Sequence, residues 1–367
     1  MNAPRGACGE CDAARKEKVR VDGDLDAATS WGHGCEGLRG TDRDVRVVVA
    51  GMPVGVREGF VYERVPWDRF AHAYGSAADV PELLEGLRSG DAAVAGDCLS
   101  SLAGSVCDQG TRYAPAALAA PFLLRIAADR TTHPRVGVLF LAAEAARDGH
   151  VGAAPRTGLL RVGGDHMRFD TGAYREDWSV QAARAAIATD AHIPIALLDD
   201  PDPRMRTGAA YVLSAAAHRA ERISAALHER LRGEGDPRVR AGLILAIAQL
   251  AHQHRHEDAA AFTRAHWADP AHALVVRASA ALAWLGLVDD PVPDDLRAFL
   301  EAIPADELDR LAGELPWLWP LARHGGVGAK AVLRRVLDPN IPATADDPPV
   351  REQGCADDPP FQAVYRK

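Results

Sequence analysis

Lysine is almost missing from this 367-residue chain, which has only four lysines among its 42 basic residues. The excess of arginine, with abundant alanine, glycine and proline, indicates the base composition of a GC-rich genome rather than arginine-specific chemistry. The formal net charge is −9. Because phosphate contacts need a net basic surface, this balance disfavours a dedicated nucleic-acid binder.

Long apolar runs and cysteine are also scarce. The sequence has no stretch of about 18 apolar residues, so it predicts no membrane-spanning helix. The N-terminal region lacks the apolar segment of a secretory signal. Six cysteines are too few for a disulfide scaffold in a chain of this length. We therefore expect a cytoplasmic protein with reduced thiols.

Two groups of possible zinc ligands are incomplete. Cys8 and Cys11, with His33 and Cys35 downstream, offer suitable ligand types, but only one residue separates the second pair. His252 and His256 would share one face of a helix, yet the glutamate that follows the first histidine in zinc proteases is missing. We therefore expect neither a metal nor a cofactor.

A repeated Asp-Pro turn followed by an Ala/Leu-rich helix organises residues 199–287. The turns are Asp202-Pro203, Asp236-Pro237 and Asp269-Pro270, so the prolines lie 34 and 33 residues apart. A period of this length is typical of stacked helical repeats, in which each unit buries its apolar face against its neighbours. The sequence therefore predicts an all-α fold of stacked antiparallel helix pairs.

The unit that begins at Asp236 shows why the repeat should be helical. Pro237 suits the first turn of a helix, where a missing N–H costs nothing, and Asp236 can cap that turn. Val239, Leu243 and Ile247 then recur at helical spacing and form one apolar stripe. Second helices are expected at about 221–232 and 257–267.

The pattern resembles HEAT repeats, particularly those of bilin-lyase-like proteins. The resemblance implies a right-handed α-solenoid in which a turn aspartate and an arginine early in the second helix form a structural ladder. The matching residues are Asp202, Asp236, Asp269, Arg206, Arg240 and Arg277. The third unit carries extra residues after its Asp-Pro pair, so we expect a longer turn there.

The stretch from about 65 to 300 also resembles a group of actinobacterial HEAT-like proteins, whose resemblance implies no known activity. The matching segments are Trp67, His72-Ala73-Tyr74-Gly75, Asp79-Val80-Pro81 and Gln109-Gly110-Thr111 with Tyr113. Asp108 stands where that group has a histidine.

Composition and pattern divide the chain into three parts. Residues 1–60 are an atypical or poorly ordered extension with one β-like run, Val45–Ala50, unless translation starts near Met52. Residues 61–340 form the repeat array, with a glycine-rich insertion at about 148–177. Residues 341–367 are rich in proline and aspartate and are expected to be disordered. At the start of the array, the spacing of Trp67, Phe70 and Tyr74 predicts a helix.

The candidate binding residues are mostly aromatic or polar side chains in or near irregular segments. A loop at 107–113 breaks the array and carries more polar groups than a short connection needs, although its residues could simply cap helices. The insertion could act as a lid or arm over the array, although flexible loops collect such residues by default. The candidates are Trp67, Tyr74, Gln109, Thr111, Tyr113, His166, Trp178 and Trp267.

Stacked helix pairs present an extended concave face that suits another polypeptide. We therefore expect a binding protein or adaptor for a protein or peptide partner, and no enzyme motif argues otherwise. The alternative is an enzyme on a HEAT scaffold, either bilin-lyase-like or like the HEAT-like DNA glycosylases. For the glycosylase, Trp178 and Trp267 would be the residues to mutate first.

Overall fold

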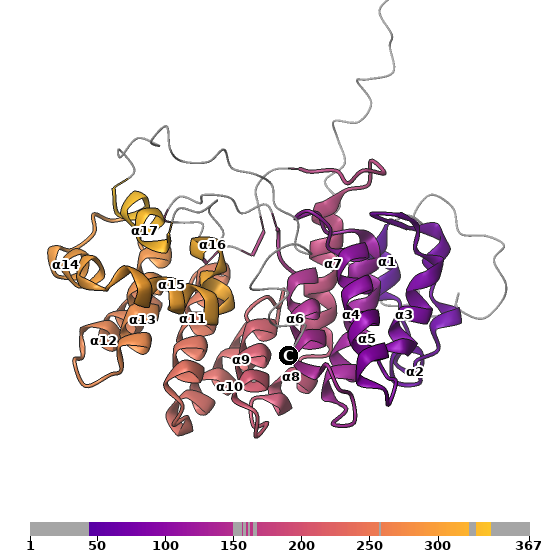
Figure 1. Cartoon of the computed structure of the whole chain (residues 1–367), viewed down its shortest axis with the longest axis horizontal. Helices are drawn as coiled ribbons and strands as arrows, with labels where there is room; N and C mark the ends of the chain where they lie inside the picture. The colour runs from indigo at the N-terminus through magenta and orange to yellow at the C-terminus, as the bar shows by residue number, and fades with distance from the viewer. Residues whose placement is uncertain are drawn as a thin grey trace, which may run out of the picture. The chain divides into compact units, whose positions relative to one another are not determined.

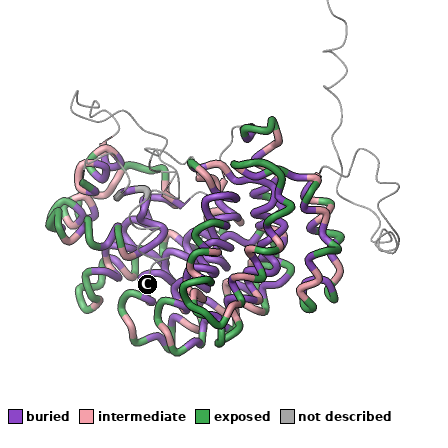
Figure 2. The backbone as a smooth tube through the Cα atoms, turned by 45° about the vertical axis from the view of Figure 1, so that its right-hand side comes forward, coloured by how far each residue is buried: buried purple, intermediate pink, exposed green. Residues whose placement is uncertain are grey.

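The structure is a computed structural model and describes residues 44–149, 156, 159–160, 162–163, 167–256, 258–322 and 328–338. Contacts divide the chain into two units, Met1–Gly37 and Leu38–Lys367, and every described residue belongs to the second. Helices dominate this unit, as Figure 1 shows, which confirms the all-α prediction. Figure 2 shows that buried residues, in purple, run through the central helices. The incomplete zinc-ligand set near the N-terminus lies outside the described residues.

The described residues from Asp44 to Gly149 form six α-helices and several short elements. The helices are α1 (Val45–Ala50), α2 (Val54–Glu58), α3 (Val80–Gly86), α4 (Ala92–Val106), α5 (Ala114–Ala128) and α6 (Arg135–Ala145). The short elements are the 3-10 helices η2 (Tyr62–Arg64), η3 (Trp67–Arg69) and η4 (Ala77–Asp79) and the strands β1 (Ala71–His72) and β2 (Gly75–Ser76).

The prediction of a β-like segment at 45–50 is wrong, because these residues form helix α1. The side chain of Asp44 accepts a hydrogen bond from the amide of Arg46 and so caps the helix. Val45 and Val49, four residues apart, are buried where α1 packs against α7 (Glu176–Thr189). This packing outweighs the strand preference of the valines, and it makes the described end of the 1–60 region part of the core.

The predicted helix across Trp67–Tyr74 is also wrong. Trp67 begins a single 3-10 turn, and strands β1 and β2 then pair antiparallel in a two-residue hairpin. Gly75, the first residue of β2, has φ 134°, which favours glycine. Apolar spacing over so few residues fits either structure, so the pattern alone could not decide between them.

The second half contains the predicted helix pairs. Their bounds are α8 (His192–Leu197), α9 (Pro203–Leu213), α10 (Ala220–Gly233), α11 (Pro237–His254), α12 (Ala259–Ala268) and α13 (Leu274–Leu287). Helices α6, α9, α11 and α13 pack side by side in that order, while α8 packs on α9, α10 on α11 and α12 on α13. These are the contacts that stacked helix pairs make, whereas the solenoid and its right hand stay predictions.

In two units the Asp-Pro turns begin a helix as expected, α9 after Asp202 and α11 after Asp236. Asp202 accepts a hydrogen bond from the Arg204 amide, and Asp236 accepts from the amides of Arg238 and Val239. Asp269 instead accepts from the Ala271 amide inside a longer turn, and α13 begins only at Leu274.

The predicted ladder arginines donate to carbonyl groups in the last turn of the preceding helix or in the loop that follows it. Arg206 donates to the carbonyls of Asp200 and Pro201, Arg240 to those of Leu231 and Glu234, and Arg277 to that of Trp267. The last carbonyls of a helix have no partner within it. These contacts therefore tie the two helices of each pair together.

The acids that link neighbouring pairs are not the capping aspartates. Arg135 pairs with Asp200 at 2.8 Å, and Arg206 pairs with Glu234 at 2.8 Å and 3.1 Å. Asp200 and Glu234 each lie two residues before a capping aspartate and accept a hydrogen bond from its amide. We call these two pairs the arginine–acid ladder.

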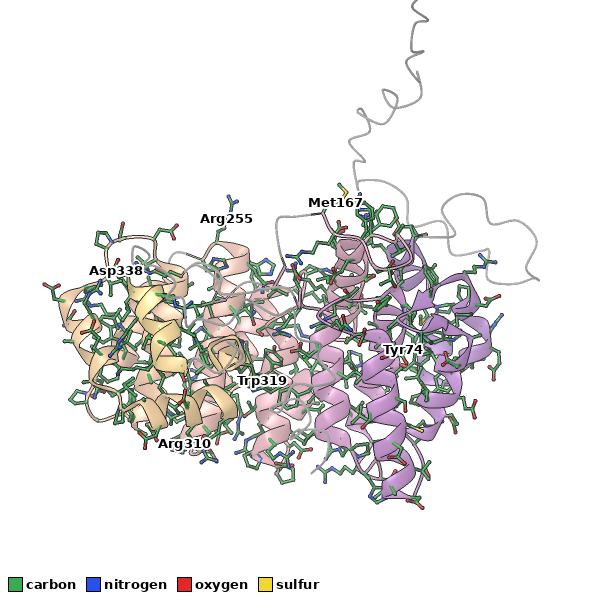
Figure 3. All side chains as sticks on the ribbon, turned by 45° about the horizontal axis from the view of Figure 1, so that its top comes forward. Tyr74, Met167, Arg255, Arg310, Trp319 and Asp338 are labelled. Carbon is green, nitrogen blue, oxygen red and sulfur yellow. The ribbon has the colours of Figure 1, made fainter. Side chains whose placement is uncertain are left out.

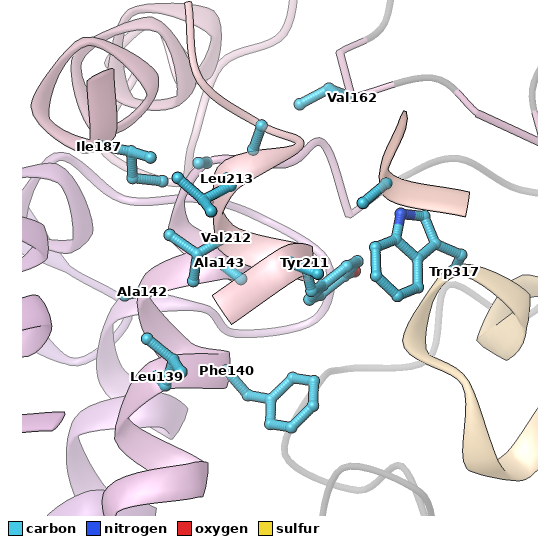
Figure 4. Packing of buried hydrophobic residues seen from close by; sticks show 14 of the residues in the cluster. Leu139, Phe140, Ala142, Ala143, Val162, Ile187, Tyr211, Val212, Leu213 and Trp317 are labelled. Carbon is cyan, nitrogen blue, oxygen red and sulfur yellow. The ribbon is translucent and has the colours of Figure 1, made fainter. Parts of the chain in front are cut away.

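The C-terminal elements pack over the last helix pairs. They are α14 (Asp294–Ala302), α15 (Ala305–Glu314), η6 (Pro316–Leu318), α16 (Trp319–Ala322) and α17 (Ala329–Leu337). Trp317 and Trp319 are 4% and 2% exposed, so both side chains belong to the hydrophobic core and are not exposed at the surface. The ring centroids of Trp317 and Tyr211 lie 4.8 Å apart, and those of Trp319 and Phe140 lie 5.7 Å apart. Figure 4 shows Trp317 beside Tyr211.

The described residues of the insertion also cover the central helices. Leu160 and Val162 are buried, and the Leu160 carbonyl accepts a hydrogen bond from Gln249 of α11. Arg156 donates to the Leu285 carbonyl and lies over the Trp284 ring. The chain itself thus fills the part of the α6–α9–α11–α13 face around Tyr211 and Gln249.

Within the described part of the chain, no helix combines the length and apolar character needed to cross a membrane.

Candidate binding surface

Trp178 differs in exposure from the other tryptophans of the described chain. The buried ones are Trp67, Trp267, Trp284, Trp317 and Trp319. Trp178, in the first turn of α7, is half-buried. The guanidinium carbons of Arg46 and Arg175 lie over its ring, 4.4 Å and 4.8 Å from the centroid. An arginine-stacked, partly exposed tryptophan is a common anchor in protein interfaces.

A short β-hairpin precedes Trp178. Phe169 and Arg175 form an antiparallel bridge. The flanking bonds run from the Asp170 amide to the Tyr174 carbonyl and from the Glu176 amide to the Arg168 carbonyl. Phe169 and Arg175 are therefore a non-hydrogen-bonded pair, whose side chains lie closest together on one face.

This hairpin presents two apolar side chains to solvent. Met167 is 59% exposed and Phe169 is 57% exposed. They lie two residues apart in the chain, and Phe169 is the residue that forms the bridge. Figure 1 shows the hairpin projecting beyond the start of α7, and Figure 3 places Met167 at the rim. We name Arg46, Met167, Phe169, Arg175 and Trp178 the Trp178 surface.

The carboxylate of Asp170 stabilises the turn of this hairpin. Asp170 accepts hydrogen bonds from the amides of Gly172 and Tyr174, at 2.9 Å and 2.8 Å, and Ala173 between them has φ 60°. Burial raises the pKa of Asp170 above its usual range, although these two amides oppose the rise.

Contacts to three other segments brace the same hairpin. The Tyr174 hydroxyl accepts a hydrogen bond from the first amide of α1, at Val45, and its ring meets Phe70 edge-on. Glu176 accepts from the Arg112 amide at 2.9 Å. Burial raises the pKa of Tyr174 to about 12. The surface therefore has a fixed backbone, which lowers the entropy lost when a partner binds.

Both arginines of the surface are positioned by acids. The Arg46 side chain forms three hydrogen bonds to Asp44, and that of Arg175 forms two to Asp177. In each case the side-chain hydrogen bond to the aspartate is the main cause that raises the pKa of the arginine. Arginines held in this way keep their stacked positions on Trp178, so the surface offers apolar and planar cationic contacts.

The structure brings several of the sequence candidates to this region. Trp178 belongs to the surface itself, and the Tyr113 hydroxyl lies 3.4 Å from Thr171 Oγ1 in the hairpin. Gln109 and Thr111 lie in the loop before Tyr113; Gln109 has φ 47°, and the Thr111 amide donates to the Asp108 carbonyl.

Tyr74 lies close to that loop in another segment. Its side chain is 73% exposed at the β1–β2 turn, where the neighbouring Ala73 amide donates to the Ser105 carbonyl.

Other candidates lie elsewhere. Trp67 is buried and donates its Nε1 hydrogen to the Tyr62 carbonyl. Trp267 is 3% exposed on α12, where it contributes to the core, so it and Trp178 do not line one groove. His166 lies outside the described residues.

Three residues of the Trp178 surface, Arg46, Met167 and Phe169, were not among the candidates expected from the sequence. Arg46 stood in the supposed strand, and the two apolar residues stood in a segment without periodicity. The one available signal was the alternation Met167-Arg168-Phe169 before the Asp170–Gly172 turn, which is a hairpin pattern.

The described part of the chain contains no group of three or more His, Cys, Asp or Glu side chains placed to hold a metal ion. When the chain is compared with protein-family models, curated proteins and solved structures, it matches none of them.

Proposed function

We propose that this chain is a non-enzymatic adaptor that holds a protein or peptide partner, and that the Trp178 surface makes the contact. The observation that carries the proposal is the pair of exposed apolar side chains, Met167 and Phe169, on a braced hairpin. Exposed apolar groups beside a stacked tryptophan and arginines have the composition of interface hot spots.

The covering of the central helices supports this choice of surface. Leu160, Trp317 and Trp319 fill the part of the α6–α9–α11–α13 face around Tyr211. A partner on that part would have to displace buried aromatic side chains, each of which contributes several kcal/mol. Binding at the hairpin needs no such displacement.

The test is capture of partners from cell extract with the full chain and two double variants. M167S/F169S removes the apolar pair, while V94S/L274S removes two apolar side chains that are 46% and 37% exposed on α4 and α13. We expect recovery of a specific protein to fall at least about tenfold with M167S/F169S only, because hot-spot truncation costs about 2 kcal/mol or more.

Circular dichroism should show equal folding of all three proteins, since exposed substitutions rarely change stability by more than about 0.5 kcal/mol. Equal recovery by both variants, or no specific protein with any of them, contradicts the proposal.

A further inference from the structure

The chain after Asp338 repeats one short pattern. Residues 345–350 read Ala-Asp-Asp-Pro-Pro-Val and residues 356–361 read Ala-Asp-Asp-Pro-Pro-Phe, eleven residues apart. Each copy combines two carboxylates, two prolines and one apolar side chain. Both copies lie outside the described residues, so their chemistry is read from sequence alone.

The fold already contains two Asp-Asp-Pro sequences, and arginines contact both. In Asp199-Asp200-Pro201, Arg230 pairs with Asp199, Arg135 pairs with Asp200, and Arg206 donates to the carbonyls of Asp200 and Pro201. Arginine is thus the side chain that recognises this sequence within the protein itself.

The second example includes a tryptophan. Arg156 lies 5.4 Å from the centroid of the Trp284 ring and donates to the Asp290 carbonyl at 2.6 Å. Asp290 belongs to Asp289-Asp290-Pro291-Val292, and Val292 packs against the core. An Asp-Asp-Pro-apolar sequence therefore lies beside an arginine–tryptophan stack in the folded chain.

The Trp178 surface offers the same kind of stack at an exposed position. Arg46 and Arg175 stack on Trp178, Met167 and Phe169 supply apolar contacts, and Arg168 forms no salt bridge with any residue that the structure describes. The carboxylates of the tail match Arg168 in charge, while Arg46 and Arg175 already pair with Asp44 and Asp177. The proline rings and the terminal Val or Phe match the apolar and aromatic groups.

We propose that the second Asp-Asp-Pro-Pro copy, at residues 356–361, binds the Trp178 surface of the same chain, as an internal ligand that a partner must displace. The inference rests on the surface assigned under the proposed function, but not on any particular partner. The first copy reaches Asp346 eight residues after Asp338, and the second reaches Asp357 after nineteen residues.

The length of this segment permits the contact. Extended chain spans about 3.3 Å per residue, so the two copies reach roughly 26 Å and 60 Å from Asp338. A compact domain of about 300 residues has a radius of gyration of about 19 Å, so its opposite sides lie roughly 50 Å apart. The second copy can therefore extend over more than the width of such a domain, whereas the first extends over only about half of it.

The experiment places a photo-crosslinking phenylalanine analogue at Phe361 in the full chain and identifies the cross-linked peptides. We expect cross-links within one chain to residues 167–178 and to α1. Their yield should fall at least fivefold in D357N/D358N and in M167S/F169S, and should stay unchanged in E352Q and in V94S/L274S.

Cross-links to other parts of the fold, or a yield independent of the aspartates, would overturn the inference. Cross-links between chains that increase with protein concentration would also overturn it, because a second copy would then be the occupant.

Partner capture separates this inference from the proposed function. If the tail occupies the surface, D346N/D347N/D357N/D358N should recover several times more partner than the unaltered chain. If residues 167–178 do not cross-link to the tail while capture still requires Met167 and Phe169, the inference fails and the proposed function stands. If the cross-links form while capture ignores these two residues, the proposed function fails and the inference stands.

Discussion

At the scale of single residues, Gln249 connects four parts of the core through one amide. Its Oε1 accepts hydrogen bonds from Arg147 at 3.1 Å, Ser214 at 2.5 Å and Trp317 at 2.9 Å. Its Nε2 donates to the Leu160 carbonyl at 3.3 Å. The side chain is 3% exposed, so water cannot replace these bonds in the native state.

Gln249→Ala should therefore destabilise the protein by about 3 kcal/mol, because several buried donors lose their acceptor and a cavity remains. The measurement is equilibrium urea denaturation. Gln181→Ala is the control, since Gln181 is exposed, and it should change stability by no more than about 0.5 kcal/mol. A loss of unfolding free energy below about 1 kcal/mol for Gln249→Ala would show that the hydrogen bonds of this amide do not hold the four parts of the core together.

At the scale of elements, the arginine–acid ladder determines how one helix pair is joined to the next. Burial alone would raise the pKa of Glu234, but hydrogen bonds from Arg206, the Asp236 amide and Arg230 outweigh it and lower the pKa to about 2. The ionised carboxylate thus links α9, α10 and the start of α11, and its effect on stability must depend on pH.

The sign of that dependence follows from the lowered pKa. A glutamate in the unfolded chain has a pKa of about 4.3, so the stabilisation is complete above this pH and is lost as the pH falls toward 2. Glu234→Gln should cost up to about 3 kcal/mol at pH 7, and the difference from the unaltered protein should shrink steadily between pH 5 and about 2.5.

Denaturation with urea at several pH values measures this difference. The exposed Glu221 on α10 provides the control Glu221→Gln, for which we expect no such trend. A difference that stays constant across the pH range would mean that the carboxylate charge is not what joins the helix pairs.

At the scale of the whole molecule, the insertion is part of the core around α13. A Cβ atom added at Gly286 would lie 2.8 Å from Leu160 Cγ and 3.0 Å from its Cδ1. Helix α13 therefore has a glycine where the insertion approaches most closely, and Leu160 is only 1% exposed.

A double-mutant cycle tests this packing. Gly286→Ala should cost about 1–3 kcal/mol through overpacking, and Leu160→Ala about 2–5 kcal/mol through the cavity it leaves. Because the smaller side chain makes room for the added methyl group, the double variant should be more stable than the sum of the two losses predicts, by at least about 1 kcal/mol.

Gly96→Ala on α4 is the matched control, since nothing lies within 4 Å of the added Cβ, and it should combine additively with Leu160→Ala. If the stability losses of Gly286→Ala and Leu160→Ala add within about 0.5 kcal/mol, this result would contradict docking of the insertion on α13.

The helix pairs could be predicted because their signals are local. Asp202-Pro203 and Asp236-Pro237 cap and start helices through their own backbone neighbours, and the apolar stripes between them recur at helical spacing. The candidate site could be predicted only in part. Trp178 and Tyr113 were singled out, whereas Arg46 was not, because its contact with Trp178 joins residues 132 positions apart.

The sequence by itself determined that this chain is helical and where most helix pairs begin and end. Capping, proline placement and apolar periodicity act over a few residues and can be read from them. Only the tertiary structure decided that α1 is a helix and that Trp317 and Leu160 fill the central face. It also decided that Trp178 stays half-exposed between two arginines. Those outcomes depend on which distant side chains remove apolar surface from water, and no local pattern specifies that choice.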